Sequence, residues 1–314
     1  MYCGLDIGGT KVLGIAVHPS DPVTPVALRR APTVADSDGL VSVMREMIDG
    51  LEADCEARFS AIGVGIAGLV DSTGVLKYSP NIDGVVDLDV RRRLCTDLRR
   101  PVVVENEATA AAWAESLHGA ARGCRHVVLV ALGTGLGTGF VFDGRVYRGW
   151  NGFAGESGHM TIEMSGPDHV TGAPGPWEYY ASGTGLGRLA RHAAAGGRLD
   201  AAVEAAGSVS AIRGEHVHAL VAEGDPDALA VLDEFCSYTA VGVANLVHVL
   251  DPEMVVIAGG LVDIGEPLVR GIEAWTHRLV LGGGQRRRVQ VVPAQLGSRA
   301  SAVGAALLAA EAGR

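Results

Sequence analysis

The chain has 314 residues, of which 48% are hydrophobic, 20% are charged and 5% are aromatic, and its formal net charge is −10. This length accommodates two modest lobes, and the acidic charge argues against nucleic acid as a partner. We interpret the one dense basic cluster, Arg286-Arg287-Arg288, as a solvated loop. Five scattered cysteines without a CxxC pair indicate a reducing compartment. Because neither a signal peptide nor a long apolar run is recognisable, we expect a cytoplasmic protein outside the membrane.

Strand patterns alternate with helical patterns along the chain. Two strands around a Gly-Gly turn are followed by a third strand, an amphipathic helix, a buried strand, a further strand and an Ala-rich helix. The pattern then restarts with two strands around a glycine-rich turn, and it ends with a strand, a Gly-Gly pair and a closing helix. The predicted ranges are, in this order, 2–7, 12–17, 23–27, 39–58, 61–66, 102–104, 107–117, 126–131, 139–142, 255–258 and 301–312.

This repetition of a glycine turn and a strand–helix series indicates a duplicated α/β unit. Two similar halves that face each other would form a cleft, which is the usual place for a ligand. We expect a small lobe of residues 1–117, completed by the closing helix within residues 300–314, and a large lobe of residues 118–299.

The first turn has the sequence Asp-Ile-Gly-Gly-Thr-Lys. Gly8 and Gly9 would let backbone N–H groups approach phosphate oxygens closely. Thr10 and Lys11 would add a hydroxyl donor and a cation, and Asp6 could hold Mg²⁺. An ordinary hairpin turn also explains the two glycines. The sequence matches neither a Walker A loop nor a dinucleotide-binding GxGxxG motif.

The second turn has glycine at alternate positions, in Gly133, Gly135, Gly137 and Gly139. This spacing removes side chains from one face of a hairpin tip, which weakens a strand unless something needs close access to its backbone. A phosphate tail would use such access, with Thr134 beside it. A plain loop is the alternative.

Polar side chains in three further segments are candidate ligand-binding or catalytic groups. Glu156 and His159 stand among glycines that let both side chains project into a pocket and hydrogen-bond sugar hydroxyls. Glu107 follows Asn106 at the end of a strand, where a carboxylate can accept a hydroxyl proton. A surface loop is the default explanation of a lone histidine, and for Glu107 taken alone the better explanation is the favourable helix dipole at a helix start. Glu178, in a Trp-Glu-Tyr segment, is a weaker candidate by itself.

The order of these motifs resembles the ROK family of repressors, open reading frames and sugar kinases over nearly the whole chain. Residues 65–71 resemble a segment between the family's early strands, residues 80–84 its sugar-pocket loop and residues 255–260 its adenosine-contacting stretch. The resemblance implies an α/β fold of the two-lobed, ribonuclease-H-like actin–hexokinase type that closes on ATP and a sugar.

The resemblance also implies a role for each motif. Glu107 is expected to be the general base in ATP-dependent phosphorylation of a hexose hydroxymethyl group, with glucose as the default acceptor. The sugar-contacting residues are expected to be Asn81, Asn106, Glu156, His159 and Glu178. ATP and Mg²⁺ are expected at Asp6, Gly8, Gly9, Thr10, Lys11, Gly133, Thr134, Gly135, Gly137, Gly259 and Gly260, with the metal on Asp6. Family members are often dimers or tetramers, so we expect a homo-oligomer.

Three positions depart from the family pattern. Glu107 stands where the family has aspartate, and the added methylene moves the carboxylate by roughly 1 Å, a displacement that can change a rate on the order of a hundredfold. Residues 169–176 lack the family's zinc-binding cysteines, and His159 with His169 cannot complete a zinc site, so we predict no zinc. Val85 stands where a tryptophan is frequent. No helix-turn-helix precedes the first turn, which argues against a DNA-binding repressor.

Two alternatives stay open. One is a kinase for a cyclitol or modified sugar in specialised metabolism. The other, from a different class, is a sugar sensor that has kept the cleft without efficient chemistry, which the glutamate in place of aspartate would also suit.

Overall fold

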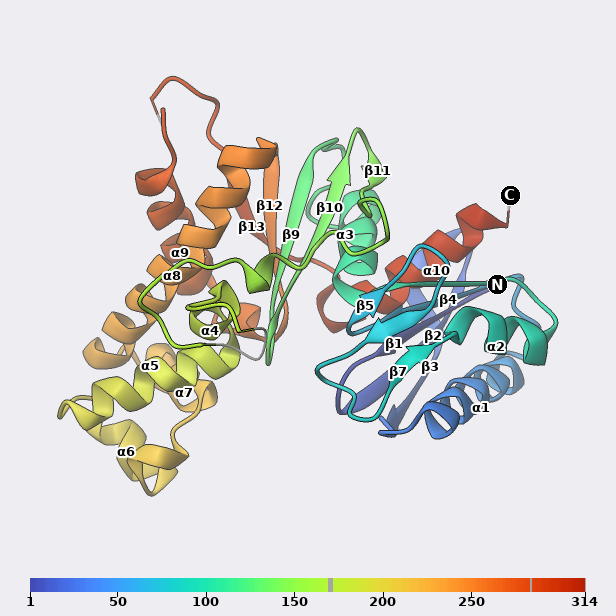
Figure 1. Cartoon of the computed structure of the whole chain (residues 1–314), viewed down its shortest axis with the longest axis horizontal. Coiled ribbons are helices and arrows are strands. Elements are labelled where there is room, and N and C mark those ends of the chain that lie inside the picture. The colour runs from blue at the N-terminus through green and yellow to red at the C-terminus, as the bar shows by residue number, and fades with distance from the viewer. Residues whose placement is uncertain (169–171, 283, 314) are drawn as a thin grey trace. The chain divides into compact units, whose positions relative to one another are not determined.

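The computed structural model describes residues 1–168, 172–282 and 284–313 and has a mixed α/β architecture (Figure 1). Its first elements are β1 (Tyr2–Ile7), β2 (Lys11–His18), β3 (Asp21–Pro32), α1 (Ser37–Cys55), β4 (Ala61–Ile66), β5 (Leu69–Val70), β6 (Leu76–Tyr78), β7 (Val86–Leu88), α2 (Val90–Leu98), β8 (Val102–Asn106) and α3 (Glu107–His118). The next are β9 (Val127–Leu132), β10 (Leu136–Phe142), β11 (Arg145–Val146), η1 (Ser157–His159), α4 (Trp177–Ala181), α5 (Gly183–Ala195), α6 (Asp200–Ala206), η2 (Val209–Ala211) and α7 (Gly214–Glu223). The last are α8 (Pro226–Leu250), β12 (Met254–Ala258), η3 (Gly260–Ile264), α9 (Glu266–Leu279), β13 (Gln290–Pro293), η4 (Gly297–Arg299) and α10 (Ala300–Ala312). The predicted strands and helices are confirmed, and helices α4 to α9 lie in stretches for which the sequence pattern predicted no helix.

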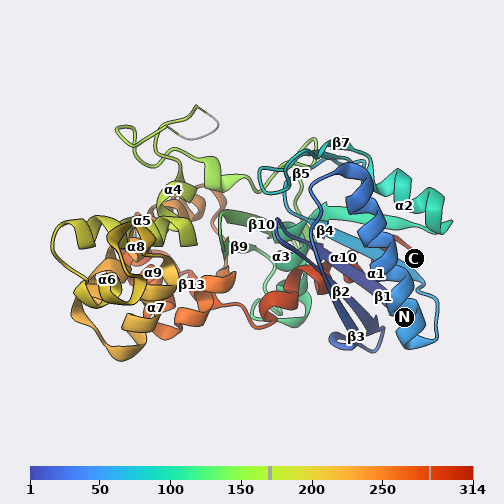
Figure 2. The same cartoon turned by 90° about the horizontal axis from the view of Figure 1, so that it is seen from below.

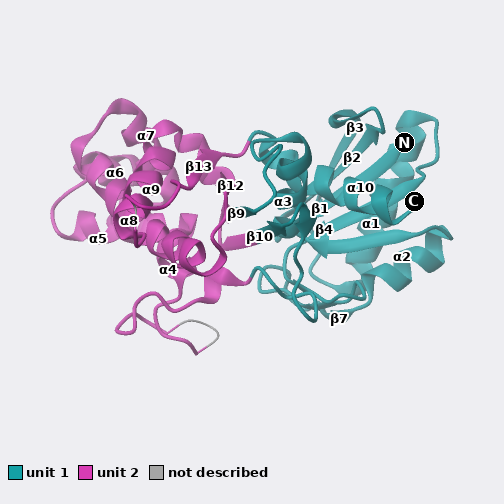
Figure 3. Cartoon of the chain, turned by 90° about the horizontal axis from the view of Figure 1, so that it is seen from above, with its two compact units in different colours: residues 1–129, 139–155, 295–314 teal, residues 130–138, 156–294 magenta. Residues whose placement is uncertain are grey.

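The chain divides into two compact units (Figure 3). The first unit consists of Met1–Leu129, Gly139–Gly155 and Gln295–Arg314, and the second consists of Val130–Thr138 and Glu156–Ala294. Among the described residues, no helix is long and apolar enough to cross a membrane.

A five-stranded sheet in the order β3-β2-β1-β4-β8 forms the centre of the first unit. Strand β1 is antiparallel to β2 and parallel to β4, and β4 is parallel to β8. In this register Ile7 lies beside Ile66, and Ile66 lies beside Asn106. Since parallel strands end at the same edge of a sheet, the turn after β1 and the residues after β8 share one edge.

The two faces of this sheet pack against different helices because side chains alternate along a strand. Leu5 and Val64 lie in one core cluster with Leu40 and Met44 of α1. On the other face a Cβ on Gly4 would lie 1.9 Å from the carbonyl oxygen of Ala302, and Gly63 is as close to Ala305. Glycine at alternate strand positions therefore lets the backbone of α10 lie directly on the sheet, as can be followed in Figure 2.

A second five-stranded sheet has the order β11-β10-β9-β12-β13, and β12 is parallel to β13. A third, small sheet has the order β5-β6-β7. In the second unit the fully buried Trp177 of α4 packs against Gly242 of α8, where a Cβ would lie 2.1 Å from the indole ring. This contact fixes the start of α4, which carries Glu178.

Candidate functional site

The predicted site residues fall into two groups, one in each compact unit. The first unit contains Asp6, Gly8, Gly9, Thr10, Lys11, Asn81, Asn106 and Glu107. The second unit contains Gly133, Thr134, Gly135, Gly137, Glu156, His159, Glu178, Gly259 and Gly260.

The first glycine turn packs against the predicted sugar loop. A Cβ on Gly9 would lie 2.6 Å from the carbonyl oxygen of Asn81, whereas a Cβ on Gly8 would meet only the oxygen of Lys11, at 3.5 Å. Gly9 is therefore required by the close approach of Asn81. Gly8 is the glycine whose bare backbone leaves room for a ligand, and Thr10 and Lys11 beside it are exposed.

Asp6 lies at the end of β1, on the face of the sheet that α10 covers. Burial raises the pKa of its carboxyl group, and the Ser301 hydroxyl and the Lys11 ammonium group oppose this shift. Mg²⁺ is commonly held by one or two carboxylates together with substrate phosphates, so a single carboxylate beside a phosphate-binding turn fits this ion. Among the described residues, no group of three or more His, Cys, Asp or Glu side chains could hold a metal ion without such a substrate.

Asn106 joins β8 to α3 and orients Glu107. Its Oδ1 atom accepts hydrogen bonds from the backbone N–H groups of Ala108 (2.9 Å) and Thr109 (3.1 Å), which caps α3. Its Nδ2 group donates to the carbonyl oxygen of Gly68 at 3.2 Å and to Oε2 of Glu107 at 2.9 Å. An asparagine side chain offers two donors and two acceptor positions, so all four are used within the protein. A sugar hydroxyl bound to this amide would have to replace one of these bonds.

The second glycine turn is shorter than the sequence pattern predicted. Strand β10 begins at Leu136, so Gly137 and Gly139 lie in the strand and the prediction of a turn up to residue 139 was wrong. Packing explains the glycine at position 139, because a Cβ there would lie 2.4 Å from the carbonyl oxygen of Ala108 in α3. The turn proper, from Gly133 to Gly135, is closed by a 3.0 Å backbone hydrogen bond between these two residues.

Glu178 is attached to this turn. Its Oε2 atom accepts a 2.7 Å hydrogen bond from the backbone N–H of Leu136. A Cβ on Gly135 would lie 2.4 Å from the same oxygen, and a Cβ on Gly158 would lie 2.6 Å from the carbonyl oxygen of Leu136. Position 135 therefore needs glycine because the Glu178 carboxylate lies against it, and position 158 needs glycine because the Leu136 carbonyl lies against it.

The same contacts bring three of the predicted sugar-binding side chains together. His159 Nε2, at the end of η1, lies 3.6 Å from Oε2 of Glu156, the residue that precedes η1. Burial raises the pKa of Glu156; His159 opposes this shift and the nearby Glu178 carboxylate adds to it. The resulting cluster of two carboxylates and an imidazole offers acceptors and a donor for several hydroxyl groups of one polar ligand.

A cavity of about 570 Å³ in the second unit lies beside the turn. Its walls contain the predicted Gly133, Thr134 and Gly260. Gly259 is next to it with a φ of 86°, and it lies so close to Leu132 that a side chain would collide with that backbone. The volume is within the range of small-molecule sites. The remaining lining residues are Gly183, Thr184, Gly187, Arg191, Arg213, Gly214, Glu215, His218, Leu261 and Ile264.

The helical wall of this cavity was not predicted from the sequence. The Gly183 N–H donates to the Gly133 carbonyl at 2.7 Å, and the Thr184 hydroxyl donates to that of Thr134 at 2.9 Å. These bonds attach the start of α5 to the turn. The wall comes from α5 and α7, whose residues form no recognisable motif, although the Ser-Gly-Thr-Gly run at the start of α5 was a signal for a closely packed helix terminus.

Described residues beside and within the segment without the expected zinc-binding cysteines are joined by backbone hydrogen bonds. Ile162 N–H donates to the carbonyl oxygen of Gly175 at 2.9 Å, and Gly175 N–H donates to that of Pro167 at 2.9 Å. Gly166 lies against the Tyr180 hydroxyl, where a Cβ would be only 2.4 Å away. The described residues around His159 do not form a zinc site. His169, the other predicted imidazole, lies outside the described residues.

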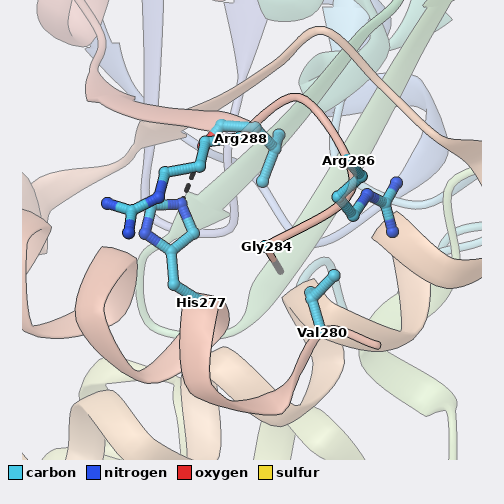
Figure 4. A pocket seen from close by; sticks show the side chains of 6 residues that line it. His277, Val280, Gly284, Arg286 and Arg288 are labelled. Atoms are coloured by element: carbon cyan, nitrogen blue, oxygen red, sulfur yellow. Dashed lines mark hydrogen bonds between the residues drawn. The ribbon is translucent and has the colours of Figure 1, made fainter. Parts of the chain in front are cut away.

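The basic cluster borders a smaller cavity of about 180 Å³ (Figure 4). Arg286 is paired with Asp251, and a ring nitrogen of His277 is hydrogen-bonded to the carbonyl oxygen of Val289 at 3.0 Å. The guanidinium groups of Arg286 and Arg288 point to opposite sides in Figure 4, so they do not converge on one anion. Arg288 is exposed, as a solvated loop requires, whereas Arg286 is partly buried.

Comparison with known proteins identifies the family. The model of the ROK family matches residues 2–312. A glucokinase of Streptomyces coelicolor is 34% identical over 312 residues, which cover 98% of this chain and 97% of the relative, and an N-acetylgalactosamine kinase of Shewanella sp. is 30% identical, with 98% and 96% covered. The crystal structure of a ROK family glucokinase from Streptomyces griseus in complex with glucose and AMPPNP is 34% identical, covers 99% of both chains and has a TM-score of 0.88. This similarity confirms the predicted α/β fold of the two-lobed actin–hexokinase type, and the chain belongs to the ROK family.

Proposed function

We propose that this chain is an ATP-dependent hexose kinase in which Glu107 is the general base. The observation that carries the proposal is the placement of Glu107 at the carboxyl edge of the first sheet, where Asn106 holds its carboxylate at 2.9 Å. The turn after β1 lies at the same edge, because β1, β4 and β8 are parallel. A carboxylate beside a phosphate-binding turn can accept the hydroxyl proton as the sugar oxygen bonds to the γ-phosphorus. The bond from that phosphorus to the β–γ bridging oxygen breaks, and ADP leaves.

The cavity of about 570 Å³ supports a nucleotide site in the second unit. Its Thr134 and Gly260 belong to the segments predicted to contact phosphate and adenosine, and the S. griseus relative was crystallised with AMPPNP. The Gly8–Lys11 turn, which is exposed from Gly9 onwards, would hold phosphate oxygens by its backbone N–H groups. Mg²⁺ carried with ATP would be held by Asp6, and it would neutralise phosphate charge during transfer.

The acceptor would be bound by Glu156, His159 and Glu178. This is supported by the 3.6 Å approach of His159 to Glu156 and by the influence of the Glu178 carboxylate on the pKa of Glu156. Carboxylates and an imidazole suit vicinal hydroxyl groups, which are donors and acceptors at once. The relatives phosphorylate different sugars by name, since one is a glucokinase and another an N-acetylgalactosamine kinase. We propose glucose as the acceptor. Faster phosphorylation of a cyclitol or a modified hexose than of glucose would identify that compound as the acceptor instead.

A coupled assay of ADP release tests the proposal with glucose, mannose, N-acylated hexosamines and cyclitols as acceptors. Glu107→Gln keeps the size of the side chain and its contact with Asn106 but cannot accept a proton at neutral pH. Its turnover is expected to fall by roughly 10²-fold or more, with sugar affinity nearly unchanged. Near-parental turnover of this variant with the true acceptor would contradict the role of Glu107. Sugar binding without ADP release from the parent would identify a sensor.

A further inference from the structure

Glu105, the residue before the Asn106–Glu107 pair, is a buried carboxylate with two defined partners. Its side chain is only 5% exposed, and its Oε2 atom pairs with Nε of Arg148 at 2.5 Å. Its Oε1 atom accepts a 3.0 Å hydrogen bond from the backbone N–H of Asn106. A buried carboxylate is unfavourable unless it is paired and hydrogen-bonded, so the Arg148 contact is what stabilises the Glu105 side chain in this buried place.

Arg148 is held in position although 40% of its side chain is exposed. It follows the short strand β11, and its carbonyl oxygen accepts a 3.1 Å hydrogen bond from the backbone N–H of Ala154. The same segment is joined to the turn after β5, because the carbonyl oxygen of Asn151 accepts a 3.0 Å hydrogen bond from Ser72. Gly152 lies so close to that turn that a Cβ would be 2.7 Å from the backbone of Ser72. The arginine therefore extends from a fixed loop.

These contacts form a continuous series from Arg148 to Glu107. Arg148 holds Glu105, Glu105 holds the backbone of Asn106, and the Asn106 amide holds the Glu107 carboxylate at 2.9 Å. We propose that Arg148 and Glu105 are positioning residues for the base of the phosphoryl transfer, an inference that rests on the proposed function. Without the arginine, an unpaired Glu105 carboxylate would turn towards water and release the Asn106 N–H. The Glu107 carboxylate would then be misplaced, although neither it nor any sugar-contacting group had been changed.

The test compares Arg148→Gln with Arg145→Gln, a matched control. Arg145 lies three residues earlier in β11, is exposed and is not part of the series. For Arg148→Gln we expect kcat to fall by about tenfold or more, since small displacements of a reacting group reduce rates steeply. The Kd for the sugar, measured by titration calorimetry, should stay within about twofold, because the cluster at Glu156 is untouched. Arg145→Gln should leave both quantities at the parental level.

Two further variants separate positioning from simple loss of structure. Arg148→Lys restores the positive charge and should recover part of kcat. The double variant Glu105→Gln/Arg148→Gln removes the unpaired buried charge, and it should be faster than Arg148→Gln alone because a neutral glutamine can still accept the Asn106 N–H. Rates are referred to the folded fraction, which thermal unfolding of each variant gives. If Arg148→Gln is unfolded, the kcat of the double variant is compared with that of Glu105→Gln, since these two differ only in the presence of Arg148.

Several outcomes would overturn the inference. Equal kcat in Arg148→Gln and Arg145→Gln would do so, and so would a parallel loss of kcat and sugar affinity that neither companion variant relieves. A parent that phosphorylates no acceptor in the panel would refute the proposed function and this inference with it. An active parent with an unaffected Arg148→Gln refutes the positioning role alone.

Discussion

The carboxylate of Glu178 accepts a 2.7 Å hydrogen bond from the backbone N–H of Leu136, the residue after Gly135. A side chain on Gly135 would begin 2.4 Å from the same carboxylate oxygen. A residue expected to contact sugar and a turn expected to contact phosphate are thus parts of one packed arrangement. Changes in either are expected to affect both ligands.

Gly135→Ala and Gly133→Ala should therefore have different effects. The new methyl group at position 135 displaces Glu178, so affinity for sugar and for nucleotide should both fall by about tenfold or more. At position 133 the nearest atom to a Cβ is 3.9 Å away, so only the approach of phosphate is disturbed and sugar affinity should persist. Titration calorimetry with each ligand measures both. Unchanged sugar affinity in Gly135→Ala would contradict the link through Glu178.

Glu107→Asp tests whether the surroundings of the base are built for glutamate. The hydrogen bond from Asn106 Nδ2 reaches Oε2 at the full length of the side chain. Removing one methylene withdraws the carboxylate by roughly 1 Å, and turnover should fall by about tenfold or more. Steady-state kinetics with the true acceptor give the answer. An aspartate variant as fast as the parent would indicate that glutamate is merely tolerated at this position.

The acid sensitivity of the first unit should depend on Glu52. Burial alone raises the pKa of this carboxyl group, but its hydrogen bonds to Arg100 and to the Phe59 N–H outweigh burial, so the pKa lies below its usual 4.5. The Glu52 and Arg100 side chains are 13% and 18% exposed. Glu52→Gln leaves Arg100 buried without its partner and should lower the free energy of unfolding at pH 7 by about 3 kcal/mol.

The pH dependence of that loss follows from the direction of the shift. A lowered pKa means that the folded state binds fewer protons, so the stabilisation is present above pH 4.5 and disappears as the pH falls through the pKa of the folded state. The parent and Glu52→Gln should therefore converge in acid, as urea denaturation at several pH values measures. Asp97→Asn is the control, because its pair with Arg45 is exposed and should contribute less than about 1 kcal/mol at any pH. A constant difference between parent and Glu52→Gln would contradict the assignment.

The chain should fold without zinc. Backbone hydrogen bonds join Gly175 to Ile162 and Pro167, and residues 162–176 contain no cysteine. Elemental analysis of the purified protein should give much less than one zinc per chain, and a chelator should leave its thermal unfolding unchanged. Stoichiometric zinc lost together with stability would contradict this prediction and would require metal ligands from other segments of the chain.

Much of the local structure could be predicted from the sequence because its causes are local. The alternation of strand and helix patterns located β1, β4, β8 and α3 closely, and Asn106 before an Ala-rich run is a recognisable helix cap. The motif order was enough for the family, since each motif keeps its place along the chain. The helices α5 and α7 carry no such motif, and their residues on the cavity wall were missed.

The identity and order of these groups could be read from the sequence alone, whereas the contacts between them became apparent only in the folded chain. Gly9 looked like a phosphate-binding glycine, yet it is the backbone of Asn81 that excludes a side chain there. Glu178 is 42 residues from Leu136 along the chain, and Arg148 is 43 residues from Glu105. Contacts at such separations depend on how strands and loops pack, and no local propensity encodes them. The physical reason is that a glycine allows another group to come close to its backbone and a charge favours an opposite charge, but neither specifies which group that is. The packing of the folded core determines which residue occupies that place.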